Sequence, residues 1–304
     1  LPQAKIIGNT IHIIQTLAKD QWRLLPEQLE DFCQRNKRPD GNPYLLILNY
    51  PGNPDGITYG AESVKQLAET CRKNNIYILS DEIYGQLHHE GKHVSIAKYY
   101  PEGTIISSGL SKWCGAGGWR LGTFSFPAKL HWLMDAMAAV ASETYTSVSA
   151  PIQYAAIQAF LCGSEIENYL SHVRKILALL GKETAAILKN GNISVNDPTG
   201  GFYLFLDFTP LSEKLVKRGI ADGSILCDRL LDECGVAILP GVDFNRPAEE
   251  LSARLSYVDF DGAKALSASY SIPLHEKFPA DFLFQYCGNV IEAAEKIVEW
   301  GNAE

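Results

Sequence analysis

Residues 107–122 place one lysine and one arginine on a stretch of backbone with few side chains. The segment is SSGLSKWCGAGGWRLG, in which the seven residues between Lys112 and Arg120 include three glycines. A lysine amine can attack a carbonyl carbon, and a guanidinium can bind a phosphate or carboxylate with paired donors. Taken alone, the segment is also typical of a surface lysine beside a flexible loop. The elements around it must therefore decide between the two interpretations.

Polar residues follow three short apolar runs that we predict to be strands. The runs cover residues 44–50, 76–82 and 104–109, and a helical pattern lies between the first two. Alternating strands and helices predict a mostly parallel sheet, which binds ligands beyond the carboxyl ends of its strands. The polar side chains at the ends of the runs and just after them are Asn49, Asn53, Asp81, Glu82, Tyr84, Ser111 and Lys112. A tight turn or a helix cap could explain each one alone, but the combination favours a ligand site.

These residues resemble those of the class I/II aminotransferases, which are fold-type I enzymes dependent on pyridoxal 5'-phosphate (PLP). The segment from Gly109 to Gly122 is similar to the lysine signature of that family throughout. The positions that match the other cofactor and substrate contacts of the family are Asn53, Asp81, Tyr84, Arg120 and Arg254. The resemblance covers nearly the whole chain.

The resemblance implies that Lys112 forms a Schiff base with the PLP aldehyde. A free lysine is protonated at neutral pH, because its pKa is roughly 10.4, and Schiff-base formation activates it. When the substrate displaces it, the released amine can move a proton between the substrate Cα and the cofactor. Asp81 is implied to pair with the pyridine nitrogen and keep it protonated, which makes the ring an electron sink.

The remaining cofactor and substrate contacts are implied by the same resemblance. Asn53 and Tyr84 are expected to hydrogen-bond the phenolic oxygen of PLP. Arg120 is expected to bind the phosphate, and Arg254 the α-carboxylate of the substrate, each with paired donors. The family often has a serine three residues before the lysine as a phosphate donor, where this chain has Gly109. We expect Ser111 to replace it.

One departure from the family bears on the substrate. Relatives selective for dicarboxylic substrates carry a second arginine some way after the lysine, but residues 142–151 (SETYTSVSAP) contain none. A neutral, aromatic or aliphatic amino acid is therefore favoured over aspartate or glutamate.

The family is also longer than this chain, which begins LPQAKII without a methionine. We expect the residue that stacks on the PLP ring and the segment that closes the site to precede residue 1. Either the sequence is a fragment, or the protein is truncated with an impaired site.

Composition excludes several classes of protein. The formal net charge is −8 and no basic block is present, which argues against nucleic acid and against an anionic membrane surface as partners. No apolar run is long enough to span a bilayer. The seven cysteines are odd in number and contain no C-x-x-C pair, which favours a reducing, cytoplasmic compartment.

Along the chain, the patterns predict two domains. Residues 1–165 are expected to form the PLP-binding large domain, an α/β fold with helices flanking a mostly parallel sheet, incomplete at its N-terminus. Residues 166–304 are expected to form an interdomain helix and a smaller C-terminal α+β domain. The long helical pattern over 165–190 marks the junction, and the alternating run over 10–16 predicts a further strand.

His89-Glu-Gly-Lys-His93 has the form of a zinc-binding H-E-x-x-H motif. That motif needs a helix to bring both imidazoles to one face, and Gly91 disfavours a helix here. We therefore expect a solvated loop and no metal site.

The resulting prediction is an aminotransferase that moves an amino group between an amino acid and a 2-oxo acid by a ping-pong mechanism. Two alternatives stay open at this point. A C–S β-lyase can use the same PLP residues, and some transcription regulators carry an aminotransferase-like domain as an effector sensor. The resemblance also implies a homodimer.

Overall fold

The computed structural model describes residues 2–37 and 41–303. Its first sheet has the strand order β1-β2-β3-β4. The first three strands are parallel and the fourth is antiparallel, which confirms the predicted mostly parallel sheet. The strands are β1 (Tyr44–Asn49), β2 (Ile76–Asp81), β3 (Thr104–Gly109) and β4 (Gly122–Ser125). All three parallel strands end at the edge where the polar residues follow.

Helices α2 (Pro26–Arg35) and α3 (Ala61–Lys73) pack on one face of this sheet. The apolar residues of α3 recur at helical spacing, and all four of them are buried: Val64, Leu67, Ala68 and Cys71. They form one core with Ile76 and Ile78 of β2. This core fixes the end of β2, and therefore the position of the residues that follow it.

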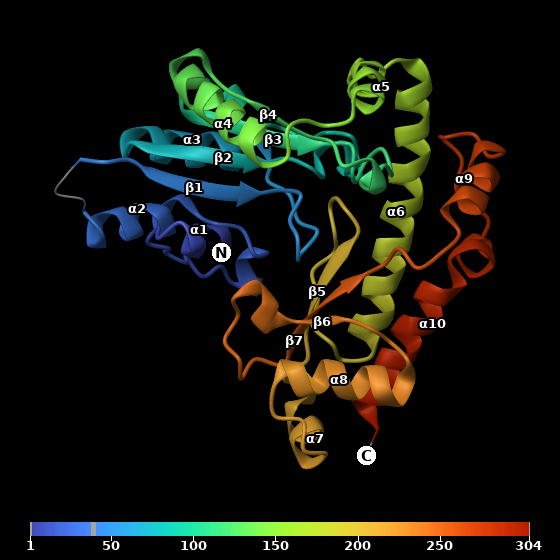
Figure 1. Ribbon diagram of the computed structural model, residues 1–304. Helices are drawn as coiled ribbons and strands as arrows, with labels where there is room; N and C mark the ends of the chain where they lie inside the picture. Colours follow the sequence, from blue (N-terminus) through green and yellow to red (C-terminus); the bar gives the residue numbers. More distant parts are fainter. Residues whose placement is uncertain (1, 38–40, 304) are drawn as a thin grey trace.

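The long predicted helix is α6 (Ser164–Asn190), with 27 residues. It runs from the level of the first sheet down to the second sheet, and α10 (Phe282–Asn302) lies beside its lower part (Figure 1). The second sheet is antiparallel with the order β5-β7-β6. Its strands are β5 (Tyr203–Asp207), β6 (Leu239–Pro240) and β7 (Ser252–Ser256). A small α+β unit follows the long helix, as predicted.

The remaining α-helices are α1 (Pro2–Ile6), α4 (His131–Thr144), α5 (Ala150–Phe160), α7 (Ser212–Lys217), α8 (Gly223–Cys234) and α9 (Gly262–Tyr270). Helix α8 illustrates how local sequence sets the bounds of these elements. The Asp222 side chain accepts a hydrogen bond from the Ile225 N–H, and Gly235 ends the helix with a φ of 69°.

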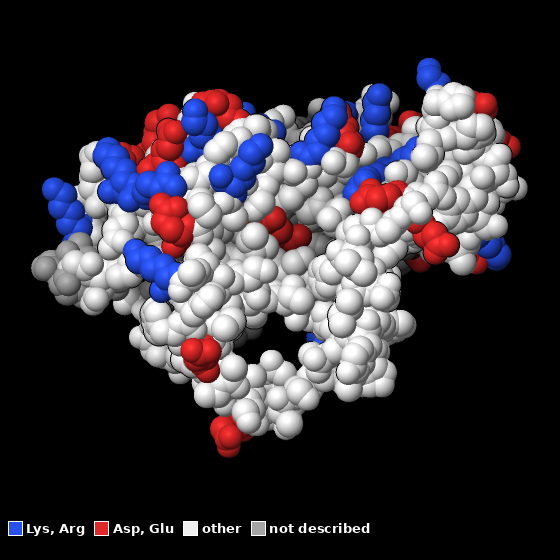
Figure 2. Space-filling view, turned by 90° about the horizontal axis from the view of Figure 1, so that it is seen from above, with Lys and Arg blue, Asp and Glu red and all other residues white. Residues whose placement is uncertain are grey.

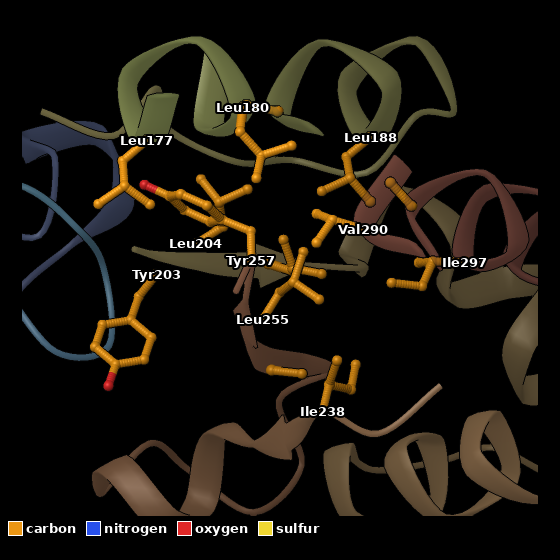
Figure 3. Close-up of a cluster of buried hydrophobic side chains, with 14 of the residues drawn as sticks. Leu177, Leu180, Leu188, Tyr203, Leu204, Ile238, Leu255, Tyr257, Val290 and Ile297 are labelled. Atoms are coloured by element: carbon orange, nitrogen blue, oxygen red, sulfur yellow. The ribbon is translucent and has the colours of Figure 1, made fainter. Parts of the chain in front are cut away.

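The core of the C-terminal part lies between α6, α10 and the second sheet. Leu180 and Leu188 of α6 meet Leu204 of β5 and Val290 of α10 (Figure 3). The chain that leads into β5 rises toward the first sheet (Figure 1). The core under β5 and β7 therefore fixes the position of the second sheet below the first.

The predicted strand over residues 10–16 is wrong. The segment forms neither helix nor strand, and Ile13 is exposed. It lies instead against the C-terminal part, where the Gln15 amide donates to the Asn245 carbonyl oxygen at 3.0 Å. Arg246 in turn donates to the Gln15 side-chain oxygen at 2.7 Å. Side-chain contacts therefore replace the ladder that the alternating pattern predicts.

Charge and cysteine placement follow the composition. On the face shown in Figure 2, basic and acidic side chains are interspersed, mostly over its upper part, and form no extended basic area. All seven cysteines are unpaired, and three of them are buried. Across the described ranges, no helix is both long and apolar enough to cross a membrane.

Candidate active site

The turn after β1 joins the ends of two strands. The Asn49 side-chain oxygen accepts a hydrogen bond from the Asn53 N–H at 2.8 Å. The Asn49 amide nitrogen donates to the Asp81 carbonyl oxygen at 3.0 Å. The peptide bond between Tyr50 and Pro51 is cis. Asn49 thus ties the loop that carries Asn53 to the end of β2, where Asp81 stands.

Asp55 lies in the same turn and is the most perturbed carboxyl group near the site. Its Oδ1 accepts a hydrogen bond from the Ile57 N–H at 2.8 Å. A Cβ at Gly52 would lie 2.2 Å from that oxygen, so only glycine fits beside it. Burial raises the pKa of Asp55 from its ordinary value of 3.8 to about 7.

This shift predicts a pH-dependent stability. Between about pH 4 and pH 7 the carboxyl group is protonated in the folded protein but ionised in the unfolded chain, so stability falls as pH rises through that window. Asp55→Asn keeps the acceptor and removes the ionisation. We expect it to raise the melting temperature by about 3 °C or more at pH 8, and by less at pH 5.

Thermal denaturation of both proteins at the two pH values measures this effect. Asp207→Asn is the matched control, because the Asp207 side chain makes the same local bond, to the Thr209 N–H, at a more exposed position. An equal gain for Asp55→Asn at pH 5 and pH 8 would contradict the prediction.

The Asp81 carboxylate is half-buried at the end of β2 and accepts a hydrogen bond from the Ile83 N–H at 3.4 Å. Burial raises its pKa above the ordinary range. Within the described ranges, no lysine, arginine or histidine forms an ion pair with it. The Asp81 carboxylate is therefore available to pair with a cationic N–H group of a ligand.

Its neighbour Glu82 has a different role. The Glu82 carboxylate accepts hydrogen bonds from the hydroxyls of Ser80 at 2.9 Å and Ser95 at 2.6 Å, and it pairs with His93 at 2.9 Å. Only Asp81 of the two adjacent acids is therefore open to a ligand.

Tyr84 and Lys112 approach each other from the segments that follow β2 and β3. The Lys112 Nζ lies 5.7 Å from the centre of the Tyr84 ring and 6.0 Å from that of Phe202. Tyr84 is 3% exposed, and burial raises the pKa of its hydroxyl far above the ordinary value, so the group keeps its proton at neutral pH. Its oxygen lies 3.1 Å from the hydroxyl oxygen of Tyr203.

Arg254 reaches the same place from β7 in the second sheet. Its Nη1 donates to the Asn53 side-chain oxygen at 2.9 Å. Its guanidinium carbon lies 4.6 Å from the centre of the Tyr203 ring and 5.0 Å from that of Phe244. Its Nε is buried and has no hydrogen-bond partner among the described residues. A buried donor without a partner is costly, and an anionic ligand would satisfy it.

A connected set of contacts results. It joins five of the seven predicted residues through the intermediates Asn49 and Tyr203: Lys112, Tyr84, Arg254, Asn53 and Asp81.

The two predicted phosphate ligands, Ser111 and Arg120, lie outside this set. Arg120 is exposed, with a φ of 56°, and its Nη1 donates to the Gly117 carbonyl oxygen at 2.8 Å. Ser111 is half-buried, and its side chain makes no hydrogen bond within the described ranges. At Gly109, a Cβ would lie 2.6 Å from the Leu121 carbonyl oxygen, which explains why no larger residue stands there.

Sequence reasoning missed Tyr203 and Phe244 as parts of the site. The pattern GGFYLFLDF predicts a strand there and nothing more. The aromatic residue at the start of that strand, close to two glycines, is the one local signal that could have pointed to Tyr203.

The H-E-x-x-H motif has no zinc-binding geometry. Residues 89–93 lie outside any helix, and Gly91 has a φ of 68°. The two histidines bind elsewhere, His89 to the Gly201 carbonyl oxygen at 3.1 Å and His93 to Glu82. Both histidines therefore connect loops next to the candidate site through their hydrogen bonds.

The family model described as aminotransferase class I and II matches residues 2–263 of this chain. The chain therefore belongs to the class I and II aminotransferases, a family whose members depend on PLP. Its fold is the PLP-dependent fold type I.

Among curated proteins, the chain is 32% identical over 260 residues to the aspartate aminotransferase of Geobacillus stearothermophilus, covering 84% of this chain and 62% of the relative. It is 33% identical over 258 residues to the aspartate/prephenate aminotransferase of Thermus thermophilus, covering 83% of this chain and 60% of the relative. The chain thus spans about three fifths of the length of these relatives.

Among solved structures, the aspartate aminotransferase of Thermus thermophilus with maleate superimposes with a TM-score of 0.75 at 25% identity. That match covers 97% of this chain and 65% of the other. The fold expected from the sequence is confirmed.

Proposed function

We propose that this protein is a PLP-dependent aminotransferase that transfers an amino group between an amino acid and a 2-oxo acid by a ping-pong mechanism. The observation that carries the proposal is the connected set of contacts between Lys112, Tyr84, Arg254, Asn53 and Asp81 in a member of the aminotransferase family. The amine, the phenol, the amide and the carboxylate lie at the carboxyl edge of the first sheet, and the Arg254 guanidinium reaches them from β7 of the second sheet.

The donor set fits the cofactor ring. Asp81 would hold the ring nitrogen, because its half-buried carboxylate has a raised pKa and no cationic partner among the described residues. The Asn53 side-chain oxygen is occupied by Arg254, which leaves the amide nitrogen to donate to the phenolic oxygen. Tyr84 keeps its proton and can donate to the same oxygen.

When bound, PLP supplies an aldehyde that takes up the amino group and a ring that accepts the electron pair from Cα. Lys112 would hold the aldehyde carbon and, once released, move a proton at the substrate Cα through its Nζ. Arg254 would bind the α-carboxylate, because its unpartnered Nε and the adjacent Nη2 present two parallel donors. Ser111 and Arg120 are proposed as phosphate ligands on the family resemblance alone.

We infer that the preferred substrate is a neutral, aromatic or aliphatic amino acid. Residues 142–151 contain no arginine. Within the described ranges, Lys112 and Arg254 are the cations that lie over the Tyr84, Tyr203 and Phe244 rings. The curated relatives named above are aspartate aminotransferases, so aspartate must be among the donors tested.

Activity assays of the PLP-loaded protein with a panel of amino donors, with and without a 2-oxo acid acceptor, test this proposal. Transamination requires the acceptor and conserves the amino group in a new amino acid. Release of ammonia and pyruvate from a cysteine conjugate without acceptor would instead identify a β-lyase. Binding of donors without turnover would identify an effector-sensing domain.

We also propose a homodimer, as the family resemblance implies. Helix α4 has no buried residue, and its exposed apolar side chains are Trp132, Met134, Met137 and Val140. An apolar surface of this extent is typical of a protein interface.

Val140→Glu places a charge on this surface and is expected to convert the dimer to a monomer in sedimentation velocity. Phe284→Glu is the matched control, because Phe284 is an exposed aromatic residue of α10, away from α4. A dimer that survives Val140→Glu would place the interface elsewhere.

Two further proposals concern the location of the protein and its division into domains. We propose a cytoplasmic location, which the seven unpaired cysteines support. We propose that the chain divides near residue 165 into a large and a small domain, because α6 begins at Ser164 and carries the chain from one sheet to the other.

A further inference from the structure

Tyr203 lies between two proposed site residues that come from different sheets. It is the first residue of β5 and is 6% exposed. The guanidinium carbon of Arg254 lies 4.6 Å from the centre of its ring. Its hydroxyl oxygen lies 3.1 Å from that of Tyr84. In Figure 3 its hydroxyl points away from the hydrophobic cluster of the C-terminal part, whereas the nearby Tyr257 lies within that cluster. The Tyr203 hydroxyl is therefore directed toward Tyr84 and away from the part of the cluster around Tyr257.

Either hydroxyl could donate in the hydrogen bond between Tyr84 and Tyr203, and the proposed function determines which one does. A phenol has one proton to donate and two lone pairs to accept with. If Tyr84 donates its proton to the cofactor oxygen, it cannot also donate to Tyr203, so Tyr203 must be the donor of the 3.1 Å bond. A phenol that accepts one hydrogen bond becomes a stronger donor in the next, because bonds in a chain polarise one another.

The ring of Tyr203 has a separate effect on Arg254. The guanidinium carbon lies over two rings, those of Tyr203 and Phe244, at 4.6 Å and 5.0 Å from their centres. Both rings attract the cation through their faces and restrict the rotation of a long side chain. We call these two rings the clamp. Because Nη1 is bound to Asn53, the clamp leaves the other edge of the guanidinium, which carries the unpartnered Nε, for a ligand.

We propose that Tyr203 is a positioning residue of this site, whose hydroxyl donates to Tyr84 and whose ring, together with Phe244, holds Arg254 for a carboxylate. The proposal rests on the proposed function for its first half. It assigns two separable roles to one side chain, and each role has its own measurement.

The hydroxyl is tested by Tyr203→Phe, which keeps the ring. In the PLP-loaded protein, the absorbance of the cofactor changes with pH as a proton is taken up near its phenolic oxygen. A weaker donor at Tyr84 stabilises the anionic oxygen less, so we expect the midpoint of this titration to rise by about one pH unit. Tyr257→Phe is the matched control, because it removes a buried phenol that donates to the Gly201 carbonyl oxygen at 3.3 Å. It should leave the midpoint unchanged.

The ring is tested by Tyr203→Leu and Phe244→Leu, with 3-phenylpropionate as a carboxylate probe in calorimetry. We expect each to raise the Kd of the probe by about 10-fold, and Tyr203→Phe to raise it by less than about 2-fold. This measurement needs no cofactor, and the two variants come from different elements, so a folding defect in one does not affect the other.

The outcomes separate this inference from the proposed function. An unchanged absorbance midpoint in a stably folded Tyr203→Phe protein overturns the role of the hydroxyl. Wild-type affinity for the probe in both leucine variants overturns the clamp. A wild-type protein that binds the probe but takes up no PLP contradicts the proposed function and the hydroxyl role, while the clamp is still decided by the probe.

Discussion

Replacement of Lys112 by alanine is expected to lower transamination by about 10⁴-fold or more. In the proposed mechanism, the variant would lose both the amine that holds the cofactor and the group that moves the proton at Cα. No other lysine among the described residues lies over the Tyr84 or Phe202 rings, so none is placed to substitute for it. Steady-state rates with the best amino donor, measured at saturating PLP, give the size of the loss.

Lys129→Ala is the matched control for this variant. The Lys129 Nζ also lies over a tyrosine ring of the same sheet, at 5.6 Å from the centre of Tyr77, but outside the proposed site. It should keep wild-type activity and stability. Equal losses in the two variants would attribute the effect to general damage, and full activity of Lys112→Ala would remove the chemical basis of the proposal.

Replacement of Arg254 by leucine is the second large effect, and it should fall on substrate binding. If Arg254 binds the α-carboxylate as proposed, the lost interaction is a charge-assisted pair in a half-buried place, worth about 3–4 kcal/mol, so kcat/KM should fall by about 100- to 1,000-fold. Arg254→Lys keeps the charge but not the paired donors, and an intermediate loss of about 10-fold is expected. The loss should appear mainly in KM for the amino acid, with cofactor binding retained.

Arg246→Leu provides the comparison for Arg254→Leu. Arg246 also lies over an aromatic ring, that of Trp22 at 5.0 Å, and pairs with Glu250. Its removal tests whether the loss of any arginine that lies over an aromatic ring in this region weakens substrate binding. A rise in KM of the same size in both variants would contradict the specific role of Arg254.

The residues of the candidate site that could be proposed from the sequence are those marked by a local pattern. Asn53, Asp81 and Lys112 each follow an apolar run, and parallel strands bring their carboxyl ends to one edge. The register pairs Asn49 with Asp81 and Asp81 with Ser107, which aligns these ends. The buried face of α3 was likewise visible as residues at helical spacing.

The parts that were missed depend on contacts between distant segments. The bond between Tyr84 and Tyr203 joins residues 119 positions apart, and that between Asn53 and Arg254 joins residues 201 apart. Periodicity describes which face of an element is apolar, but it carries no information on which two elements meet. Tyr203 therefore appeared in the sequence only as part of a strand.

The error over residues 10–16 has the same origin. Their alternation fits a strand, but a strand needs a partner with free backbone groups. In the structure, Gln15 bonds to Asn245 and Arg246 instead, 230 and 231 positions away. Long-range side-chain contacts decided the conformation of this segment.

The most direct test of the central claim is to locate the cofactor on the chain. The PLP-loaded protein is reduced with borohydride, digested, and its peptides are analysed by mass spectrometry. We predict a single pyridoxyl phosphate adduct, on Lys112 in the peptide that contains SSGLSK. An adduct on a different lysine, or no adduct in a protein that is folded and saturated with PLP, would contradict the account.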